Sequence, residues 1–421
     1  MLVRQQHKLR HLARSFIANR TISKNLVFKQ EAVKEKYDDV FHKQERYGLT
    51  EQSKAAPSFS TDNVLKVPQT QTTVFNNGFR VVTEPRYGET SAVGLFIKVG
   101  SRDENVMNNG IAHFLEHMYF KGTKTRTGRD LEAEFENMGA TLNAHTSREY
   151  TCFTTHCLKD NVKQASDALC DIIANSNLES KDIEAERDTI LREKADVEST
   201  VVEVLFDEMH KSAYIDNTLG MTILGPEGNI GQTINRNKML LFRDQNYVAQ
   251  NMVLLGVGNV DHQELVQVAE KYFGSWPSSP VIGRPNTAPK RRTNFIGGDV
   301  RFDTANVPEL HIAVGFEGPS YVSNDMVVIQ LMQLIWGSYD KNQGCAKYVA
   351  QNLSRIIADD NLAYVMQPFQ HVYSDTSIFG IRTISDGGED TDTLIMEVVS
   401  HMARLAYRVK GEELIRAKNL L

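Results

Sequence analysis

Two histidines and a glutamate stand close together in the segment His113-Phe114-Leu115-Glu116-His117. The apolar pattern around them predicts a helix over residues 110–120, and residues four apart in a helix lie on the same face. Both imidazoles would therefore project at a separation that one Zn²⁺ can bridge, with Glu116 beside the metal. The order H-x-x-E-H is the reverse of the commoner H-E-x-x-H. Taken alone, the motif also fits two surface histidines on an amphipathic helix.

A catalytic zinc site needs a third protein ligand, and a second predicted helix offers carboxylates for it. Glu193 lies 76 residues beyond His117, and Glu186 lies seven residues before Glu193, two turns along the same face. This spacing, together with the segments Phe-Lys-Gly-Thr at 120–123 and Asn-Ala-His-Thr at 143–146, resembles the pitrilysin-type inverse zincins. The resemblance covers residues 72–421 and extends to the branch of that family that processes imported mitochondrial proteins.

The resemblance implies a role for each residue of this set. His113, His117 and Glu193 would hold Zn²⁺, and Glu116 would take a proton from the metal-bound water. Glu186 would orient the site from behind the ligands, and its alternative interpretation is a solvated charge on the helix surface.

The resemblance also implies contacts with a peptide substrate. The strand 142–145, with Asn143 and Ala144, would be a sheet edge that pairs with an extended peptide through main-chain hydrogen bonds. Phe120 would pack against the residue after the cleaved bond, although plain core packing explains this residue as well.

Glu203 and Asp207 are two carboxylates four residues apart on one predicted helix. Like charges at that spacing repel, so the pair is expected to meet a cation. The resemblance implies that this cation is an arginine two residues before the cleaved bond, because bidentate pairing favours arginine over lysine. An exposed acidic helix face is the alternative.

Strand and helix signals alternate along the part of the chain that must position these residues. A hairpin over 73–82 and strands at 92–97, 140–158 and 252–257 are interspersed with helices near 110–120, 128–138, 161–175, 180–211, 232–246 and 261–273. This pattern predicts an α+β fold, in which a mostly antiparallel sheet is covered by helices.

The same order of elements restarts after a linker at 277–292. A strand at 310–316 takes the place of 91–96, and it is followed by helices near 322–337 and 343–357, strands near 361–367 and 376–384, and a helix from Asp390. We therefore expect two homologous domains, a zinc-bearing domain over 69–276 and an inactive domain over 293–421. The copies are offset by about 220 residues, so a complete second copy would extend roughly 70 residues past Leu421, and the second domain is expected to be truncated.

The first thirty residues contain no acidic side chain and seven lysines and arginines. Apolar residues accompany them at helical spacing, which is typical of a mitochondrial transit peptide. We expect a transit peptide over 1–30 and a mixed-charge linker over 31–68, and a solvated basic tail is the alternative.

Composition excludes several classes of protein. The 421 residues carry a net charge of −6, which argues against nucleic-acid binding by bulk electrostatics. No apolar run approaches the roughly 20 residues of a membrane-spanning helix. The four cysteines lack C-x-x-C spacing and are interpreted as reduced thiols of an intracellular compartment.

The leading hypothesis is a zinc endopeptidase subunit that removes presequences in the mitochondrial matrix or on the matrix face of the inner membrane. The resemblance implies an α-type subunit, or core protein 2, as its partner. That subunit would carry a run of glycines at 337–344, and this chain lacks the run, which argues for the β type and against the α type. The alternatives are a structural core protein of the cytochrome bc1 complex with little or no peptidase activity, and a stand-alone oligopeptidase.

Overall fold

The computed structural model describes residues 69–215, 217–279, 293–303, 307–343 and 349–421. The expected transit peptide at 1–30, the linker at 31–68, most of the linker at 277–292 and Cys345 lie outside the described residues. The chain from Pro68 onward forms one compact unit.

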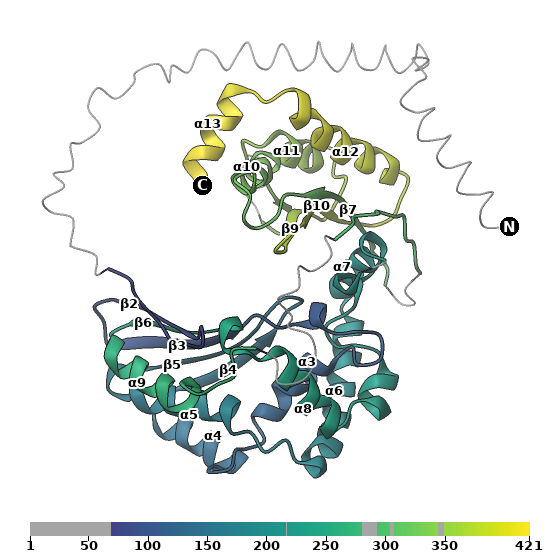
Figure 1. Ribbon diagram of the computed structural model, residues 1–421. Coiled ribbons are helices and arrows are strands. Elements are labelled where there is room, and N and C mark those ends of the chain that lie inside the picture. The colour runs from purple at the N-terminus through teal and green to yellow at the C-terminus, as the bar shows by residue number, and fades with distance from the viewer. Residues whose placement is uncertain (1–68, 216, 280–292, 304–306, 344–348) are drawn as a thin grey trace, which may run out of the picture. The chain divides into compact units, whose positions relative to one another are not determined.

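The first half of this unit is built on a six-stranded sheet with the order β1-β2-β6-β3-β5-β4 (Figure 1). Its strands are β1 (Gln71–Val74), β2 (Arg80–Pro85), β3 (Thr90–Ile97), β4 (Thr141–Thr146), β5 (Thr151–Leu158) and β6 (Met252–Gly258). Neighbouring strands are antiparallel except for β2 and β6, which are parallel. Among the described residues, β5 is the one strand that pairs with β4, so β4 is an edge of the sheet.

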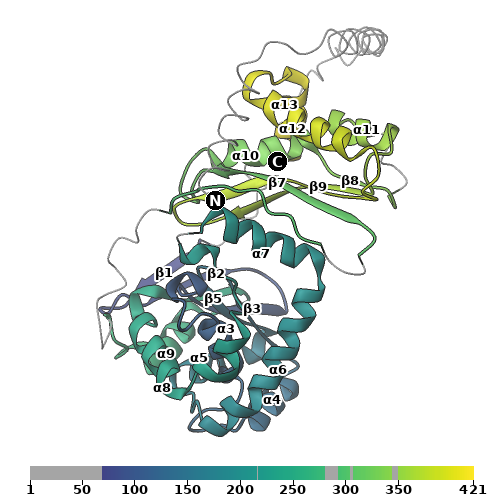
Figure 2. The same ribbon diagram turned by 90° about the vertical axis from the view of Figure 1, so that its right-hand side faces the viewer.

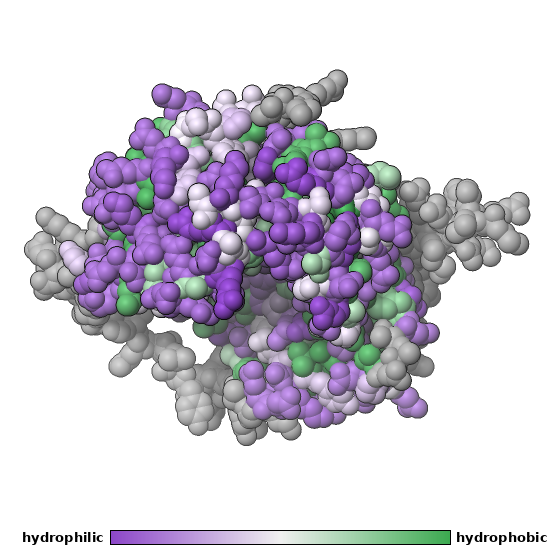
Figure 3. Space-filling view, turned by 90° about the horizontal axis from the view of Figure 1, so that it is seen from below, coloured by the Kyte–Doolittle hydropathy of each residue, from purple (hydrophilic) through white to green (hydrophobic). Residues whose placement is uncertain are grey.

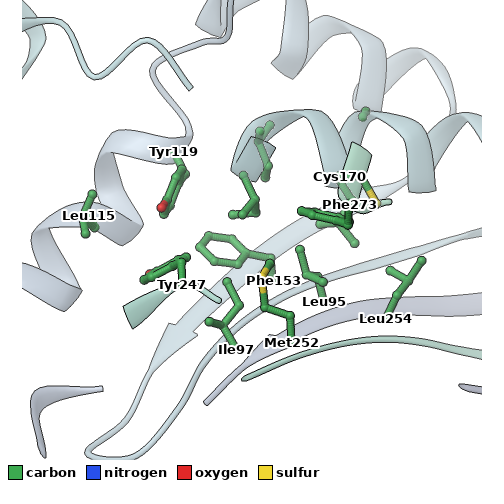
Figure 4. Packing of buried hydrophobic residues seen from close by; sticks show 14 of the residues in the cluster. Leu95, Ile97, Leu115, Tyr119, Phe153, Cys170, Tyr247, Met252, Leu254 and Phe273 are labelled. Carbon is green, nitrogen blue, oxygen red and sulfur yellow. The ribbon is translucent and has the colours of Figure 1, made fainter. Parts of the chain in front are cut away.

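Helices cover one face of this sheet. They are α3 (Ile111–Tyr119), α4 (Gly128–Asn137), α5 (Val162–Ala174), α8 (Arg236–Asn246) and α9 (His262–Phe273), and α5 and α9 lie along the strands in Figure 1. Phe153 of β5 points into this layer and meets Tyr119 of α3, with ring centroids 5.4 Å apart (Figure 4). Burying a large apolar side chain contributes about 1.5–3 kcal/mol, so this contact fixes α3 against the sheet. The outer surface seen in Figure 3 is mostly hydrophilic, as expected for amphipathic helices.

The segment predicted as one helix over 180–211 is two helices, α6 (Ser180–Ser199) and α7 (Val201–Ala213). Thr200 between them has extended backbone angles, φ −89° and ψ 102°. Thr200, Val201 and Val202 form a β-branched run, which has low helix propensity, and this explains the break. The break places Glu193 on α6, whereas Glu203 and Asp207 lie on α7.

The second half contains a four-stranded antiparallel sheet with the order β7-β10-β9-β8. The strands are β7 (Leu310–Gly318), β8 (Tyr339–Asp340), β9 (Val365–Val372) and β10 (Ser377–Ser385). Figure 2 shows its helices on one side of the sheet, namely α10 (Met326–Trp336), α11 (Asn352–Asp359), α12 (Thr391–Tyr407) and α13 (Gly411–Leu420).

The two halves repeat one topology. The path β3-α3-α4-β4-β5-α5 recurs as β7-α10-α11-β9-β10-α12, with the short strand β8 added between α10 and α11, and in each copy the strand before the last helix lies between the other two long strands. This confirms the predicted α+β fold with two homologous domains. Strands β1, β2 and β6 have no counterpart among the described residues of the second half. Helix α10 takes the place of α3, and its sequence contains neither histidine nor carboxylate, so the predicted metal-binding motif is not repeated in α10.

A buried arginine joins the two halves. Arg102, in the turn η2 (Ser101–Asp103) before α3, has a side chain that is 2% exposed. It is paired with Glu149 of the first half, and its Nη2 lies 2.7 Å from Asp375 Oδ2 of the second half. Its Nη2 also donates to Thr293 Oγ1 at 2.5 Å. A charge at this depth is stable only because several acceptors surround it.

In the part of the chain that the structure describes, no helix combines the length and the apolar character needed to cross a membrane.

Candidate active site

The start of α3 is held by a residue that the sequence analysis missed. Glu104 is 4% exposed, and its carboxylate accepts hydrogen bonds from the backbone N–H groups of Gly110 and Ala112, both at 2.8 Å, and from the Asn109 amide at 2.7 Å. These bonds satisfy N–H groups that the first turn of a helix leaves unpaired. Burial raises the pKa of Glu104 to about 7 against the lowering effect of the same bonds. An acidic residue shortly before a predicted helix start is the signal that could have identified it.

The structure brings the three predicted metal ligands together. His113 and His117 lie on α3 with ring centroids 4.7 Å apart, and Glu193 approaches both of them from α6. Glu193 Oε1 lies 3.5 Å from His113 Nε2, and Glu193 Oε2 lies 3.1 Å from His117 Nε2. One potential ligand atom from each residue lies within 4.8 Å of the others, and no second such cluster occurs among the described residues.

The electrostatics of this cluster suit a cation. Hydrogen bonds to His113 and then His117 lower the pKa of Glu193. Burial lowers the pKa of His117, but the carboxylates of Glu193 and Glu186 outweigh it, so the net shift is upward. Two imidazoles and one carboxylate are also the donor set of a common class of catalytic zinc sites, so the residues present fit this metal.

Glu186 occupies the position expected of a residue that orients a ligand. It is 7% exposed, and its Oε1 lies 3.1 Å from His117 Nδ1 while its Oε2 lies 2.5 Å from Lys121 Nζ. These contacts contradict the alternative interpretation of Glu186 as a solvated charge on the helix surface. Burial raises the pKa of Glu186, but Lys121 and His117 outweigh burial and lower it. Holding Nδ1 leaves His117 Nε2 directed at Glu193, the arrangement in which a second carboxylate aligns a metal-binding histidine.

The side chain of Glu116, the predicted base, extends from α3 to the edge strand β4 of the sheet. Its Oε2 accepts a hydrogen bond from the hydroxyl of Thr146, the last residue of β4. Asn143 of the same strand is exposed, Ala144 is half-buried, and β4 has a free edge, as the substrate-binding hypothesis requires.

Phe120 ends α3, is half-buried against the core, and has its ring centroid 6.2 Å from that of Phe153. The structure thus supports a packing role for part of the Phe120 ring.

The two carboxylates predicted as a pair on α7 have different surroundings, because Asp207 pairs with an arginine of the protein and Glu203 does not. Asp207 Oδ1 accepts a hydrogen bond from Arg148 Nη2 at 2.6 Å, so the cation expected at this carboxylate comes from the protein itself. Glu203 is exposed and has no ion-pair partner among the described residues. Sequence spacing treated the two carboxylates alike, because it could not place Arg148, which lies in the turn between β4 and β5, beside α7.

We expect His113→Ala, His117→Ala and Glu193→Ala each to lose stoichiometric zinc, because each removes one of three ligands. Glu186→Gln should retain the metal but bind it about 10- to 100-fold more weakly, because only the orientation of His117 is disturbed. Metal analysis and competition with a chelating dye would measure both effects. His156→Ala, an exposed histidine on β5, is the matched control. Full zinc content in His117→Ala would contradict the assignment.

Comparison with protein families adds to this geometry. Residues 80–227 match the model described as insulinase (peptidase family M16), and residues 233–421 match that of the peptidase M16 inactive domain. The mitochondrial-processing peptidase subunit beta of Neurospora crassa is 41% identical over 351 residues, which cover 83% of this chain and 74% of that protein. The subunit of the same name from Bos taurus is 39% identical, covering 85% of this chain and 72% of that protein.

Other similar proteins have different names. The ubiquinol-cytochrome-c reductase complex core protein I of Euglena gracilis is 38% identical, covering 82% of this chain and 72% of that protein. Among solved structures, a chain of complex III2 from Candida albicans has a TM-score of 0.72 at 22% identity and covers 83% of this chain and 80% of its own length. A protease from Helicobacter pylori has a TM-score of 0.71 at 23% identity and covers 84% and 83%. These two structures share the fold.

Proposed function

Because the chain belongs to the M16 family of metallopeptidases, we propose that it is the catalytic, β-type subunit of a heterodimeric zinc endopeptidase that removes presequences from proteins imported into mitochondria. The observation that carries the proposal is the clustering of His113, His117 and Glu193, with Glu116 on the same helix. Relatives at 39–41% identity that are named as this subunit support the choice within the family.

The chemistry divides among a few side chains. His113, His117 and Glu193 would hold Zn²⁺, which when bound polarises a carbonyl and makes water more acidic. Glu116 accepts the proton of the attacking water on the carboxylate oxygen that Thr146 does not hold. It then returns a proton to the amine that leaves when the peptide bond breaks. Glu186 keeps the His117 ring in its orientation throughout.

Two surfaces would place the presequence. An extended peptide would add to the free edge of β4 near Asn143 and Ala144 through its main chain. Glu203, exposed on α7, would meet an arginine two residues before the cleaved bond, and Asp207 would add the carboxylate oxygen that Arg148 does not hold. The contact of Phe120 with the residue after the cleaved bond would use the half of its ring that is not packed on the core.

The partner would be an α-type subunit or its relative, core protein 2. Holding a flexible peptide carries an ordering cost that a second protein wall helps to offset. The relatives are mitochondrial proteins, so this chain is a mitochondrial protein, and we place it in the matrix or on the matrix face of the inner membrane. Its expected transit peptide, at residues 1–30, suits that destination.

The second candidate function is that of a structural core protein of the cytochrome bc1 complex. The 38% identity to the core protein I of Euglena gracilis favours it. The two functions are compatible, because a chain can retain its catalytic residues while it is built into a larger complex. Residual peptidase activity of the purified complex distinguishes a catalytic core protein from a purely structural one.

Cleavage of paired presequence peptides tests the function and the arginine contact together. The chain, reconstituted with an α-type subunit, should cleave a presequence peptide with arginine two residues before the cleaved bond faster than one with norleucine there. Glu203→Gln should lower kcat/KM about 10- to 100-fold for the arginine peptide and little for the other, because one charge-assisted contact is lost.

Glu208→Gln, on the same helix and paired with Lys211, is the matched control. Equal losses for both peptides would show that Glu203 acts on stability. Absence of cleavage of either peptide by the unaltered pair would contradict the proposed function.

A further inference from the structure

We propose that Thr146 is a positioning residue that holds the catalytic carboxylate of Glu116 and couples it to the strand on which the substrate lies. The inference rests on the proposed function, in which Glu116 is the base and β4 is the substrate-binding edge. Thr146 is 5% exposed, and its hydroxyl donates a hydrogen bond to Glu116 Oε2. Among the described residues, it is the one side chain that hydrogen-bonds this carboxylate.

A general base must present one oxygen to the reacting water, and a glutamate has two equivalent oxygens on a flexible side chain. A donor on Oε2 removes this freedom and leaves Oε1 available to accept the proton. Small errors in the position of a reacting group can cost about 100-fold in rate, so an aligned carboxylate is worth a dedicated contact. The proton is taken up on Oε1, so the hydroxyl can keep donating to Oε2 before and after the transfer.

The backbone of Thr146 is fixed by the sheet. It is directly opposite Thr151 in the antiparallel pairing of β4 with β5, and the Thr151 hydroxyl donates to the Val99 carbonyl at 2.9 Å. The hydroxyl of Thr146 therefore projects from a rigid element, which holds a functional group more exactly than a loop does.

No strand in the described part of the chain pairs with the opposite edge of β4, and it is the edge that an added peptide strand would use. A peptide aligned on residues 142–145 is thus aligned on the strand that ends in the hydroxyl holding the base. The register of the substrate and the position of Glu116 are set by the same six residues of β4.

Two substitutions separate the hydroxyl from the shape of the side chain. Thr146→Val keeps the branched shape and removes the hydroxyl, whereas Thr146→Ser keeps the hydroxyl. In the zinc-loaded complex with an α-type subunit, Thr146→Val should lower kcat about 10- to 100-fold with KM within about twofold. Thr146→Ser should stay within about threefold of the unaltered protein, and zinc content should be unchanged in both.

Thr155→Val is the matched control, because Thr155 is a buried threonine of the neighbouring strand whose hydroxyl has no partner among the described residues. It should keep full activity. A Thr146→Val protein with unchanged kcat, or one in which only KM rises, would overturn the inference.

A double-substitution cycle tests the connection to Glu116 directly. In a Glu116→Gln background, Thr146→Val should lower kcat by less than about twofold, because the base that Thr146 positions is already absent. A full further loss in that background would mean that Thr146 acts through substrate binding or folding, and it would overturn the inference. If the unaltered complex cleaves other peptides but not presequences, the proposed substrate class is wrong, and the kcat ratios of the Thr146 variants on those peptides still test the role of Thr146. If the complex cleaves no peptide, the proposed function and the role of Thr146 are both wrong.

Discussion

Glu116→Gln is expected to lower the turnover of presequence peptides by about 100-fold or more while zinc content and peptide affinity remain close to normal. The amide has nearly the shape of the carboxylate but cannot accept the proton of the attacking water. The three side chains proposed to bind the metal are not altered, so the loss should appear in kcat and not in KM.

Single-turnover kinetics, metal analysis and binding of a labelled peptide would separate these three quantities. Glu132→Gln on α4, an exposed glutamate, is the matched control and should behave like the unaltered protein. A zinc-loaded Glu116→Gln protein with near-normal turnover would show that another group is the base.

Arg102→Met is expected to reduce the free energy of unfolding by about 2–4 kcal/mol. The substitution preserves much of the side-chain volume but leaves Glu149 and Asp375 without their guanidinium. The side chains of Glu149 and Asp375 are 20% and 26% exposed, so water can partly replace the lost hydrogen bonds. The expected loss of stability is therefore at the lower end of the range for a broken buried ion pair. Urea unfolding at neutral pH would measure it, with the exposed Arg129→Met on α4 as the control.

The acid dependence of stability gives a second test of this junction. Burial raises the pKa of Asp375, but bonds from Arg102 and Thr293 outweigh burial and bring it to about 2, below the ordinary 3.8. A carboxyl with a depressed pKa stabilises the folded state above about pH 3.8, and that stabilisation is lost as the pH falls toward 2. Arg102→Met should weaken this dependence. If the unaltered protein and Arg102→Met have the same free energy of unfolding and the same dependence of that energy on pH, the role given to Arg102 is contradicted.

The local parts of the site follow from short-range sequence patterns. His113 and His117 share a helix face because of their spacing, and the helix itself is predicted from its apolar residues. Glu193 required the family resemblance, because its approach to the histidines depends on how α6 packs beside α3. The two-domain α+β fold follows from the repeated order of strands and helices.

The contacts that cross between elements could not be read from the sequence. Arg148 lies far along the chain from Asp207, and only the packing of a sheet turn against α7 brings them together. The hydroxyl of Thr146 meets Glu116 for the same kind of reason. The break at Thr200 was missed because polar and apolar residues keep a helical period on both sides of it. Such features depend on tertiary packing, which overrides local propensity.

The arrangement of strand edges bears on self-association. An open edge offers unpaired backbone groups to any extended chain, including another copy of the same protein. In the second sheet, one edge strand, β7, packs against α7, and the other, β8, has two residues. In the first sheet, β1 has four residues and β4 has six, so β4 is the longer of its two edge strands. The strand that would receive the substrate therefore also offers an open edge to unwanted pairing, and an occupied peptide site would protect this edge from aggregation.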